Sequence, residues 1–261
     1  MIIYKAYTTL HRHWYLLIIP LLIDTASLIT GLKFVELYEV PRPPFIIINE
    51  MGLPSITHIL DKPLLINSFK FLTVFDEVSI SIVVLVILFI LFNSFGQGAY
   101  IGMMHKIVKQ ERIKWSNPFY LASKFSLRFF LWAFIILFLQ LSVVTFLTMM
   151  LNVVGIFTSL ALFLILRFVF VYFEFCIVIY NTNFIKALSI SFQMFKQRNS
   201  ETYVIVPMII IVAGLFSYIL HQYWSLQSII ICILLYTYIM TGLQVTLMMT
   251  LQKLMKELNP T

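Results

Sequence analysis

Six long apolar stretches, separated by short segments that carry nearly all of the charge, constrain this chain more than any other feature of its sequence. The stretches cover residues 14–32, 78–103, 129–151, 155–180, 203–220 and 228–251. Each is long enough for an α-helix to cross a hydrocarbon core of about 30 Å. Only 11% of the residues are charged, against about 25% in soluble domains, so little length is left for a soluble domain. We therefore predict an all-α, polytopic membrane protein in which residues 1–261 form a single transmembrane domain of six helices.

Lys and Arg are distributed unevenly between the connecting segments, of which alternate ones share a side of the membrane. The N-terminal tail, loop 104–128, loop 181–202 and the C-terminal tail carry two, six, three and two of them, whereas loop 33–77 carries four. Because positive charge favours the cytoplasmic side, we predict a cell-membrane protein with both termini in the cytoplasm, facing anionic lipid. We expect no binding to nucleic acid, since the chain has no room to build a folded basic surface.

A short segment of similar character precedes each pair of apolar stretches. These segments are residues 3–6, 117–122 and 183–187. In the second, Asn117 and Pro118 form a favourable helix start. In the third, apolar side chains recur every three or four residues on one helix face. They are Phe184, Leu188, Phe192 and Phe195, with Ala187 in the same helix. We expect interfacial amphipathic helices on the cytoplasmic leaflet, so that the chain repeats a surface helix and a transmembrane hairpin three times.

The end of the fourth apolar stretch and the segment after it resemble a known group of proteins. Glu174 lies near the end of that stretch, and residues 183–192 read Asn-Phe-Ile-Lys-Ala-Leu-Ser-Ile-Ser-Phe. This arrangement is similar to a broad group of bacterial six-helix integral membrane proteins, which includes the membrane domain attached to some glycerophosphodiester phosphodiesterases. The resemblance implies the six-helix architecture. We expect no phosphodiesterase activity, since no catalytic domain follows the last apolar stretch.

Residues 33–77 form a long loop that we place outside the membrane. It contains the stiff segment 41–44, with three prolines, and several apolar pieces that a solvent-exposed loop would not need. We expect short elements that dip into the outer interface or form an apolar cap over the bundle. The two interpretations are a packed structural cap and a lid or partner-docking surface.

Polar residues inside the apolar stretches are the candidates for a functional site, because they are costly in a membrane unless paired or hydrated. Counted along their helices, Asp24 and Arg167 lie at similar depth, so we predict an ion pair between the first and fourth helices. Glu174 lies seven residues after Arg167 and hence on the same helix face, and Gln140 lies near the midplane of the third helix. The predicted intramembrane polar cluster is either a structural contact or a path for protons, ions or a polar substrate.

Two further groups of residues predict contacts near the cytoplasmic side. Ser94, Gly98 and Gly102 recur every four residues, which is typical of close packing between membrane helices; a hinge is the alternative. Directly after them, loop 104–128 carries a basic cluster. Its residues are Lys106, Lys109, Arg112 and Lys114. In permease subunits of ABC exporters a segment at this position docks on the ATPase, whereas attraction to anionic lipid would also explain the charge.

Nothing in the sequence matches a nucleotide-binding loop, a zinc-protease motif or a nucleophile elbow, and no Cys and His residues cluster at metal-ligand spacing. We expect Cys176 and Cys232 to be buried and unreactive, and we expect no enzymatic activity, cofactor or metal. The predicted function is an accessory, assembly or regulatory component of the cytoplasmic membrane. The alternative is a permease-like membrane subunit of a transporter that needs a separate ATPase or ion gradient. The expected partners are lipid and either another membrane protein or a cytoplasmic ATPase.

Overall fold

The computed structural model describes residues 2–35, 52–60, 64–74, 79–111, 116–197 and 200–258, and within these ranges the chain is helical and contains no β-strand. Its elements are α1 (Ile2–Arg12), η1 (Trp14–Leu17), α2 (Ile18–Gly31), η2 (Ile56–His58), η3 (Phe69–Val74), α3 (Ile80–Val108), α4 (Asn117–Leu151), α5 (Val153–Val169), α6 (Phe173–Ile179), α7 (Phe184–Lys196), α8 (Ser200–Gln222) and α9 (Leu226–Leu258).

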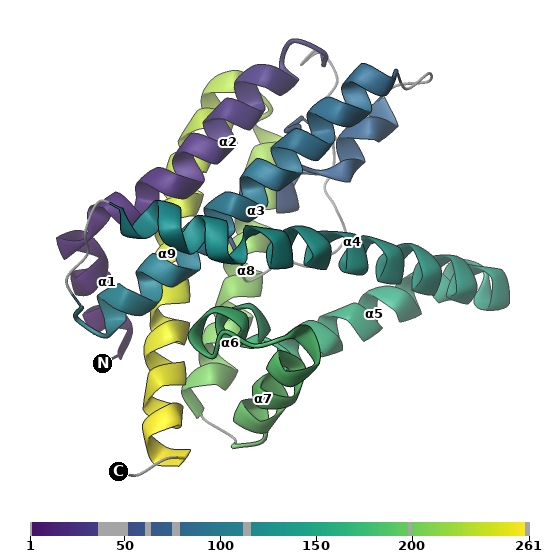
Figure 1. Cartoon of the computed structure of the whole chain (residues 1–261). Coiled ribbons are helices and arrows are strands. Elements are labelled where there is room, and N and C mark those ends of the chain that lie inside the picture. The colour runs from purple at the N-terminus through teal and green to yellow at the C-terminus, as the bar shows by residue number, and fades with distance from the viewer. Residues whose placement is uncertain are drawn as a thin grey trace.

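The described residues contain six helical segments that are long and apolar enough to cross a membrane, as predicted. They are Trp14–Gly31, Ile80–Val108, Asn117–Leu151, Val153–Ile179, Ser200–Gln222 and Leu226–Lys256. The two ends of the chain lie on the same side of the molecule, as an even number of crossings requires (Figure 1). The all-α class is therefore confirmed and the six apolar helices are compatible with a multi-pass membrane protein, whereas the side of the membrane on which the termini lie stays a prediction.

α4 differs from the prediction, because the expected surface helix at 117–122 is not a separate element. It forms the first turns of one 35-residue helix that continues to Leu151. Pro118 lies in the first turn, where its missing N–H costs nothing, and the sequence from there to Leu151 contains no further Pro and no Gly. At about 1.5 Å per residue, α4 is about 50 Å long and exceeds the thickness of a hydrocarbon core unless it is strongly tilted.

The fourth predicted span is divided into two helices. α5 ends at Val169, the chain turns at residues 170–172, and α6 then continues from Phe173.

The two cysteines, Cys176 and Cys232, are free and buried.

α1 packs against the middle of α9. Its residues Ala6 and Leu10 are buried, and the Tyr7 hydroxyl donates a hydrogen bond of 3.0 Å to the carbonyl oxygen of Ile239. The close approach depends on Gly242, because a Cβ atom at that position would lie 2.3 Å from the Tyr7 ring. Burial between the helices raises the pKa of Tyr7. One face of the first predicted surface helix is therefore fixed to the bundle.

α7 is a separate helix, but its buried face differs from the predicted one. The buried residues are the smaller side chains Ala187 and Ser191, together with Met194. Phe184, Leu188 and Phe195 flank this face and are half-buried, whereas Phe192 is 39% exposed. The aromatic side chains stack on neighbouring rings instead. These contacts are Phe184 with Trp132, Phe192 with Phe170, and Phe195 with Phe168.

The described parts of the loop between α2 and α3 lie between the helices of the bundle. Gly52 lies against α3, where an added Cβ atom would be 2.0 Å from Nε2 of Gln97. Ser217 of α8 donates a hydrogen bond of 2.9 Å to the carbonyl oxygen of Ile59. The backbone of Leu64 also touches α2. Non-helical backbone is tolerated at membrane depth only where protein surrounds it, which is the case here.

α4 and α5 form a hairpin that projects from the rest of the molecule (Figure 1). No residue of α4 after Phe129 is buried. In α5 the buried residues are Gly155, Ser159 and Phe163, one every four residues on a single face. A Cβ atom on Gly155 would lie 2.0 Å from the carbonyl oxygen of Leu147, so this face packs on α4. The outer part of the hairpin is thus only two helices thick, with uncovered faces.

Candidate functional site

Asp24 lies near the middle of α2 and is completely buried, with 0% of its surface exposed. Its two carboxylate oxygens accept hydrogen bonds from the Ser55 hydroxyl at 2.5 Å and from the backbone N–H of Ile56 at 2.9 Å. Both donors belong to the loop segment that enters the bundle. Because a buried carboxylate is very costly without such donors, Asp24 and this segment stabilise each other's position.

The hydrogen-bond network around Asp24 continues through the loop. The Thr57 hydroxyl lies 2.9 Å from the Ser55 hydroxyl and donates a hydrogen bond of 2.7 Å to Oδ1 of Asn67. All of these side chains are buried, and they join the two described pieces of the loop to each other and to α2. Asp24 lies seven residues before Gly31, so the network reaches about 10 Å below the end of α2.

The predicted ion pair between Asp24 and Arg167 is wrong. Nη1 of Arg167 lies 2.7 Å from Oε1 of Glu174, and the exposed fractions of the two side chains are 16% and 1%. The turn at residues 170–172 brings these side chains together from α5 and α6. Gln140 is half-exposed on α4, outside both contacts. The four predicted residues therefore form no single cluster, because Asp24 bonds to the loop and Arg167 bonds to Glu174.

A buried polar face of α9 was not singled out from the sequence. Thr237, Thr241 and Gln244 are each 0% exposed and lie on one side of the helix. The Tyr100 hydroxyl of α3 donates a hydrogen bond of 2.7 Å to Oε1 of Gln244 and lies 3.2 Å from the Thr241 hydroxyl. The spacing of four and three residues was present in the sequence. It was a weak signal, since a helical Thr often bonds only to its own backbone.

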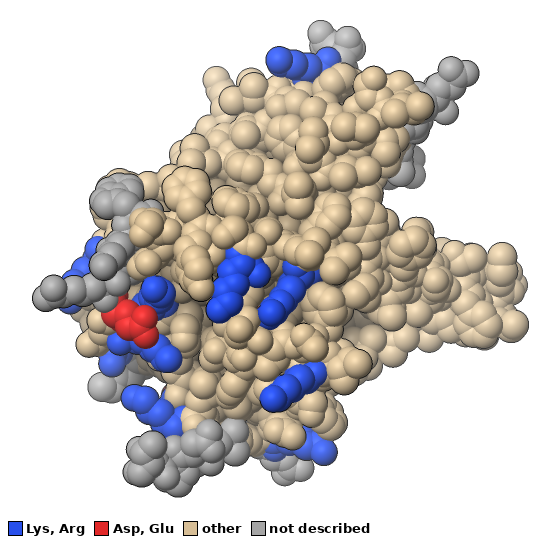
Figure 2. Space-filling view, in the orientation of Figure 1, with Lys and Arg blue, Asp and Glu red and all other residues tan. Residues whose placement is uncertain are grey.

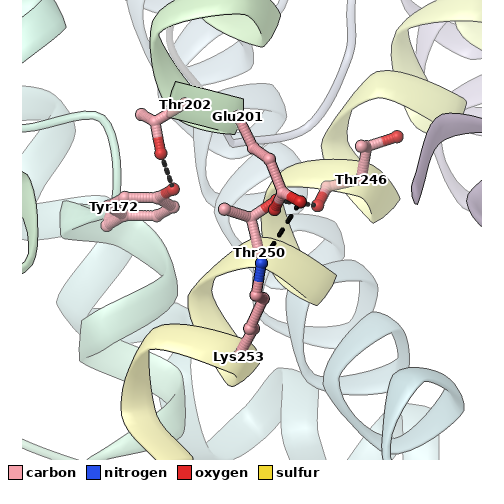
Figure 3. A network of polar contacts seen from close by, with 6 residues as sticks. All are labelled: Tyr172, Glu201, Thr202, Thr246, Thr250 and Lys253. Atoms are coloured by element: carbon pink, nitrogen blue, oxygen red, sulfur yellow. Dashed lines mark hydrogen bonds and ion pairs between the residues drawn. The ribbon is translucent and has the colours of Figure 1, made fainter. Parts of the chain in front are cut away.

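A second polar network joins the first turn of α8 to the turn that precedes α6 and to α9 (Figure 3). The Tyr172 hydroxyl lies 2.6 Å from the Thr202 hydroxyl. Glu201 accepts a hydrogen bond of 3.4 Å from Nζ of Lys253 and one of 3.5 Å from the Thr250 hydroxyl. These contacts fix the end of the bundle at which the chain terminates.

The strip of small residues on α3 packs against α4. A Cβ atom on Gly98 would lie 3.1 Å from Cβ of Phe125, and one on Gly102 would lie 2.9 Å from the Leu121 side chain. Ser94, one turn earlier, is 2% exposed. α3 is an uninterrupted helix through this strip, and the close contacts with α4 are those of a helix-packing surface, whereas the hinge stays a prediction.

Basic side chains spread over the left, centre and bottom of the molecule in this view and also occur at its top, while the projecting hairpin at the right carries no charge (Figure 2). Lys106 is half-exposed and Lys109 is exposed at the end of α3. Arg112 and Lys114 lie outside the described residues. The predicted docking of an ATPase at this basic cluster therefore stays a prediction.

An open apolar groove of about 520 Å³ lies where the hairpin leaves the bundle, between α4 and the start of α7. It is lined by Leu131, Phe134, Ile135, Phe138, Leu139, Ser142, Val143 and Phe184. Ser142 is the only residue in this lining with a polar side chain. The groove is therefore suited to a hydrocarbon ligand and not to a polar substrate.

The chain matches no protein-family model, no curated protein and no solved structure. Its resemblance to the group of bacterial six-helix membrane proteins stays an expectation.

Proposed function

We propose that this protein is a non-enzymatic integral membrane protein that serves as an accessory or assembly component by binding a membrane-spanning helix of another protein along its α4–α5 hairpin. The observation that carries the proposal is the uncovered hairpin itself. Its helices pack on each other through one face of α5, and α4 has no buried residue after Phe129.

The chemistry of the hairpin restricts the partner to an apolar segment. Residues 129–166 contain no Asp, Glu, Lys, Arg or His. A soluble partner would have to cover this surface in water, whereas a membrane-spanning helix presents a matching apolar surface within the bilayer. In lipid, helices associate through van der Waals packing and not through a hydrophobic driving force, so a long uncovered hairpin offers the contact area that such packing needs.

The tip of the hairpin favours a protein partner over lipid alone. Met149 and Met150 of α4 are 78% and 66% exposed, and Phe157 of α5, seven residues after Met150, is 58% exposed. Flexible Met side chains and large aromatic rings adapt to varied partner surfaces and are characteristic of binding sites. The internal polar contacts of Asp24 and Arg167 support the same function, because both side chains are engaged within the chain.

Site-specific photocrosslinking in native membranes tests this proposal. A photoreactive amino acid at Phe157 should give one discrete crosslinked protein that has membrane-spanning segments of its own. The matched control is Ile211 of α8, which is 60% exposed and also apolar, and it should give no such product. Replacing Phe157 and Met150 by Ala should reduce copurification of the same partner at least fivefold, with unchanged elution of the purified protein.

Crosslinking to lipid alone, or equal yields from both positions, would overturn the proposal. A product of twice the mass of the chain would assign the hairpin to self-association instead and would equally contradict binding to a different protein.

A second candidate function, a membrane subunit of a transporter, is favoured by the loop segment beside Asp24. Non-helical backbone next to a buried carboxylate is an arrangement found along transport paths. Ser55→Cys tests it with a membrane-impermeant thiol reagent, since Cys176 and Cys232 are both buried and give a low background. Labelling in intact membranes would support a water-filled path to Asp24, whereas labelling only after unfolding would support a purely structural contact.

A further inference from the structure

We infer that the groove between α4 and α7 binds one anionic phospholipid, with an acyl chain along α4 and the phosphate between Lys124 and Arg128. This inference does not depend on the proposed partner protein, because it concerns the groove where the hairpin leaves the bundle and not the tip of the hairpin. It requires only that α4 lies in a membrane.

One exposed stripe of α4 joins the basic residues to the groove. Along the helix this stripe follows a spacing of four, three, four, three and four residues, which places its members on one face. The members are Lys124, Arg128, Leu131, Ile135, Phe138 and Ser142. The first two are cationic and the last four line the groove. An amphiphile with an anionic head and a hydrocarbon tail matches this order of charge and apolar surface.

Both cations lie near the same aromatic ring. Nζ of Lys124 lies 5.3 Å and the guanidinium carbon of Arg128 lies 5.7 Å from the centre of the Phe125 ring. Among the residues that the structure describes, no carboxylate forms an ion pair with either of them. Two neighbouring cations that share an aromatic ring repel each other, and an anion between them removes that repulsion.

Arg128 is held at the mouth of the groove. Its Nη1 donates a hydrogen bond of 3.3 Å to the carbonyl oxygen of Thr182, two residues before Phe184, which closes the groove on the α7 side. The guanidinium has five N–H donors in a planar fork, so this contact leaves donors for a phosphate. The groove extends from Leu131 to Val143, about 18 Å along the helix, which accommodates an extended acyl chain.

Lipid retention measured by native mass spectrometry tests the inference. The purified protein is incubated in micelles that contain phosphatidylglycerol and phosphatidylcholine with identical chains. We expect the native protein to retain one phosphatidylglycerol in preference to phosphatidylcholine. The double variant Lys124→Gln with Arg128→Gln should lower that retention by at least roughly fivefold, the effect of removing a cation near an anionic surface. The control double variant Lys5→Gln with Lys256→Gln removes two exposed cations elsewhere and should change retention less than twofold.

A second variant addresses the groove without changing its charge. Ile135 is 42% exposed, so Ile135→Trp fills the groove without disturbing the core and should also abolish the preference for phosphatidylglycerol. Phosphatidylglycerol with a photoreactive acyl chain should label peptides from residues 131–143 more than peptides from α8. Equal retention of both lipids by the native protein would overturn the inference. Equal losses in the site and control double variants would overturn it as well, because they would assign binding to general surface charge.

Discussion

Asp24 accepts a hydrogen bond from the backbone N–H of Ile56, and this contact joins the middle of α2 to the start of the short helix η2, 32 residues later in the chain. This segment belongs to loop 33–77, which the count of membrane-spanning helices places outside the bundle. The segment can lie between helices because its polar groups find partners there, and Asp24 accepts hydrogen bonds from two of them, the Ser55 hydroxyl and the backbone N–H of Ile56.

Replacing Asp24 by Ala should lower the free energy of unfolding by about 1–3 kcal/mol, because the N–H of Ile56 would be left buried without an acceptor. Asp24→Asn should cost less, since its amide oxygen can accept from Ile56 and its NH₂ group can donate to Ser55. Thermal unfolding in detergent micelles measures the difference. Ser27→Ala is the control, because Ser27 is also 0% exposed but its hydroxyl has no partner among the described residues. Equal losses in the Asp24 and Ser27 variants would contradict the proposed role of the contact.

Arg167 and Glu174 should behave as one buried ion pair. Either Arg167→Gln or Glu174→Gln alone should cost about 3 kcal/mol, because each substitution breaks the ion pair and leaves the other charge in the low-dielectric interior. The exchange Arg167→Glu with Glu174→Arg should recover more than half of that loss, as a double-mutant cycle would measure. The exchange Asp24→Arg with Arg167→Asp should recover none of it. If only the exchange of Asp24 and Arg167 recovered stability, the result would favour an ion pair between those two residues and contradict the pair seen in the structure.

Gly98 and Gly214 form a matched pair for testing helix packing. Gly98→Leu should cost about 1–3 kcal/mol, because its Cβ atom would already lie 3.1 Å from Cβ of Phe125 and the longer side chain would separate α3 from α4. Gly214 has nothing within 4 Å of an added Cβ atom, so Gly214→Leu should leave the stability unchanged or slightly higher. The midpoints of thermal unfolding check both variants, and similar midpoints would show that α4 does not pack closely on this strip.

The His13 imidazole should titrate below its ordinary pKa of about 6.5, because burial lowers that pKa and the charge of Arg12 lowers it further. A lowered pKa means that the neutral ring is favoured in the folded protein. Its contribution to stability is complete above about pH 6.5 and is lost as the pH falls through the folded-state pKa. NMR titration of labelled histidines should show the His13 midpoint rising in Arg12→Gln and staying unchanged in Lys5→Gln. A midpoint at or above 6.5 in the native protein would contradict this prediction.

The six helices could be predicted from the sequence because the bilayer imposes a simple rule. A spanning segment must satisfy its own backbone hydrogen bonds, so length and hydropathy alone identify it. The small-residue strip at Ser94, Gly98 and Gly102 could be predicted from the sequence for a similar reason, since residues spaced four apart lie on the same helix face. The pair of Arg167 and Glu174 could also be predicted from their spacing of seven residues, because Glu174 is closer to Arg167 in the sequence than Asp24 is.

The sequence by itself thus determined the number of apolar segments long enough to cross a membrane and the segregation of basic residues, because these properties depend on residues close together in the chain. Only the tertiary structure decided which polar groups meet. Counting residues gives the depth of Asp24 in the membrane but not the direction in which its side chain points around α2, and that direction follows from how α2 packs on its neighbours. The path of residues 52–60 into the bundle likewise depends on contacts between segments distant in sequence, such as Asp24 with Ile56.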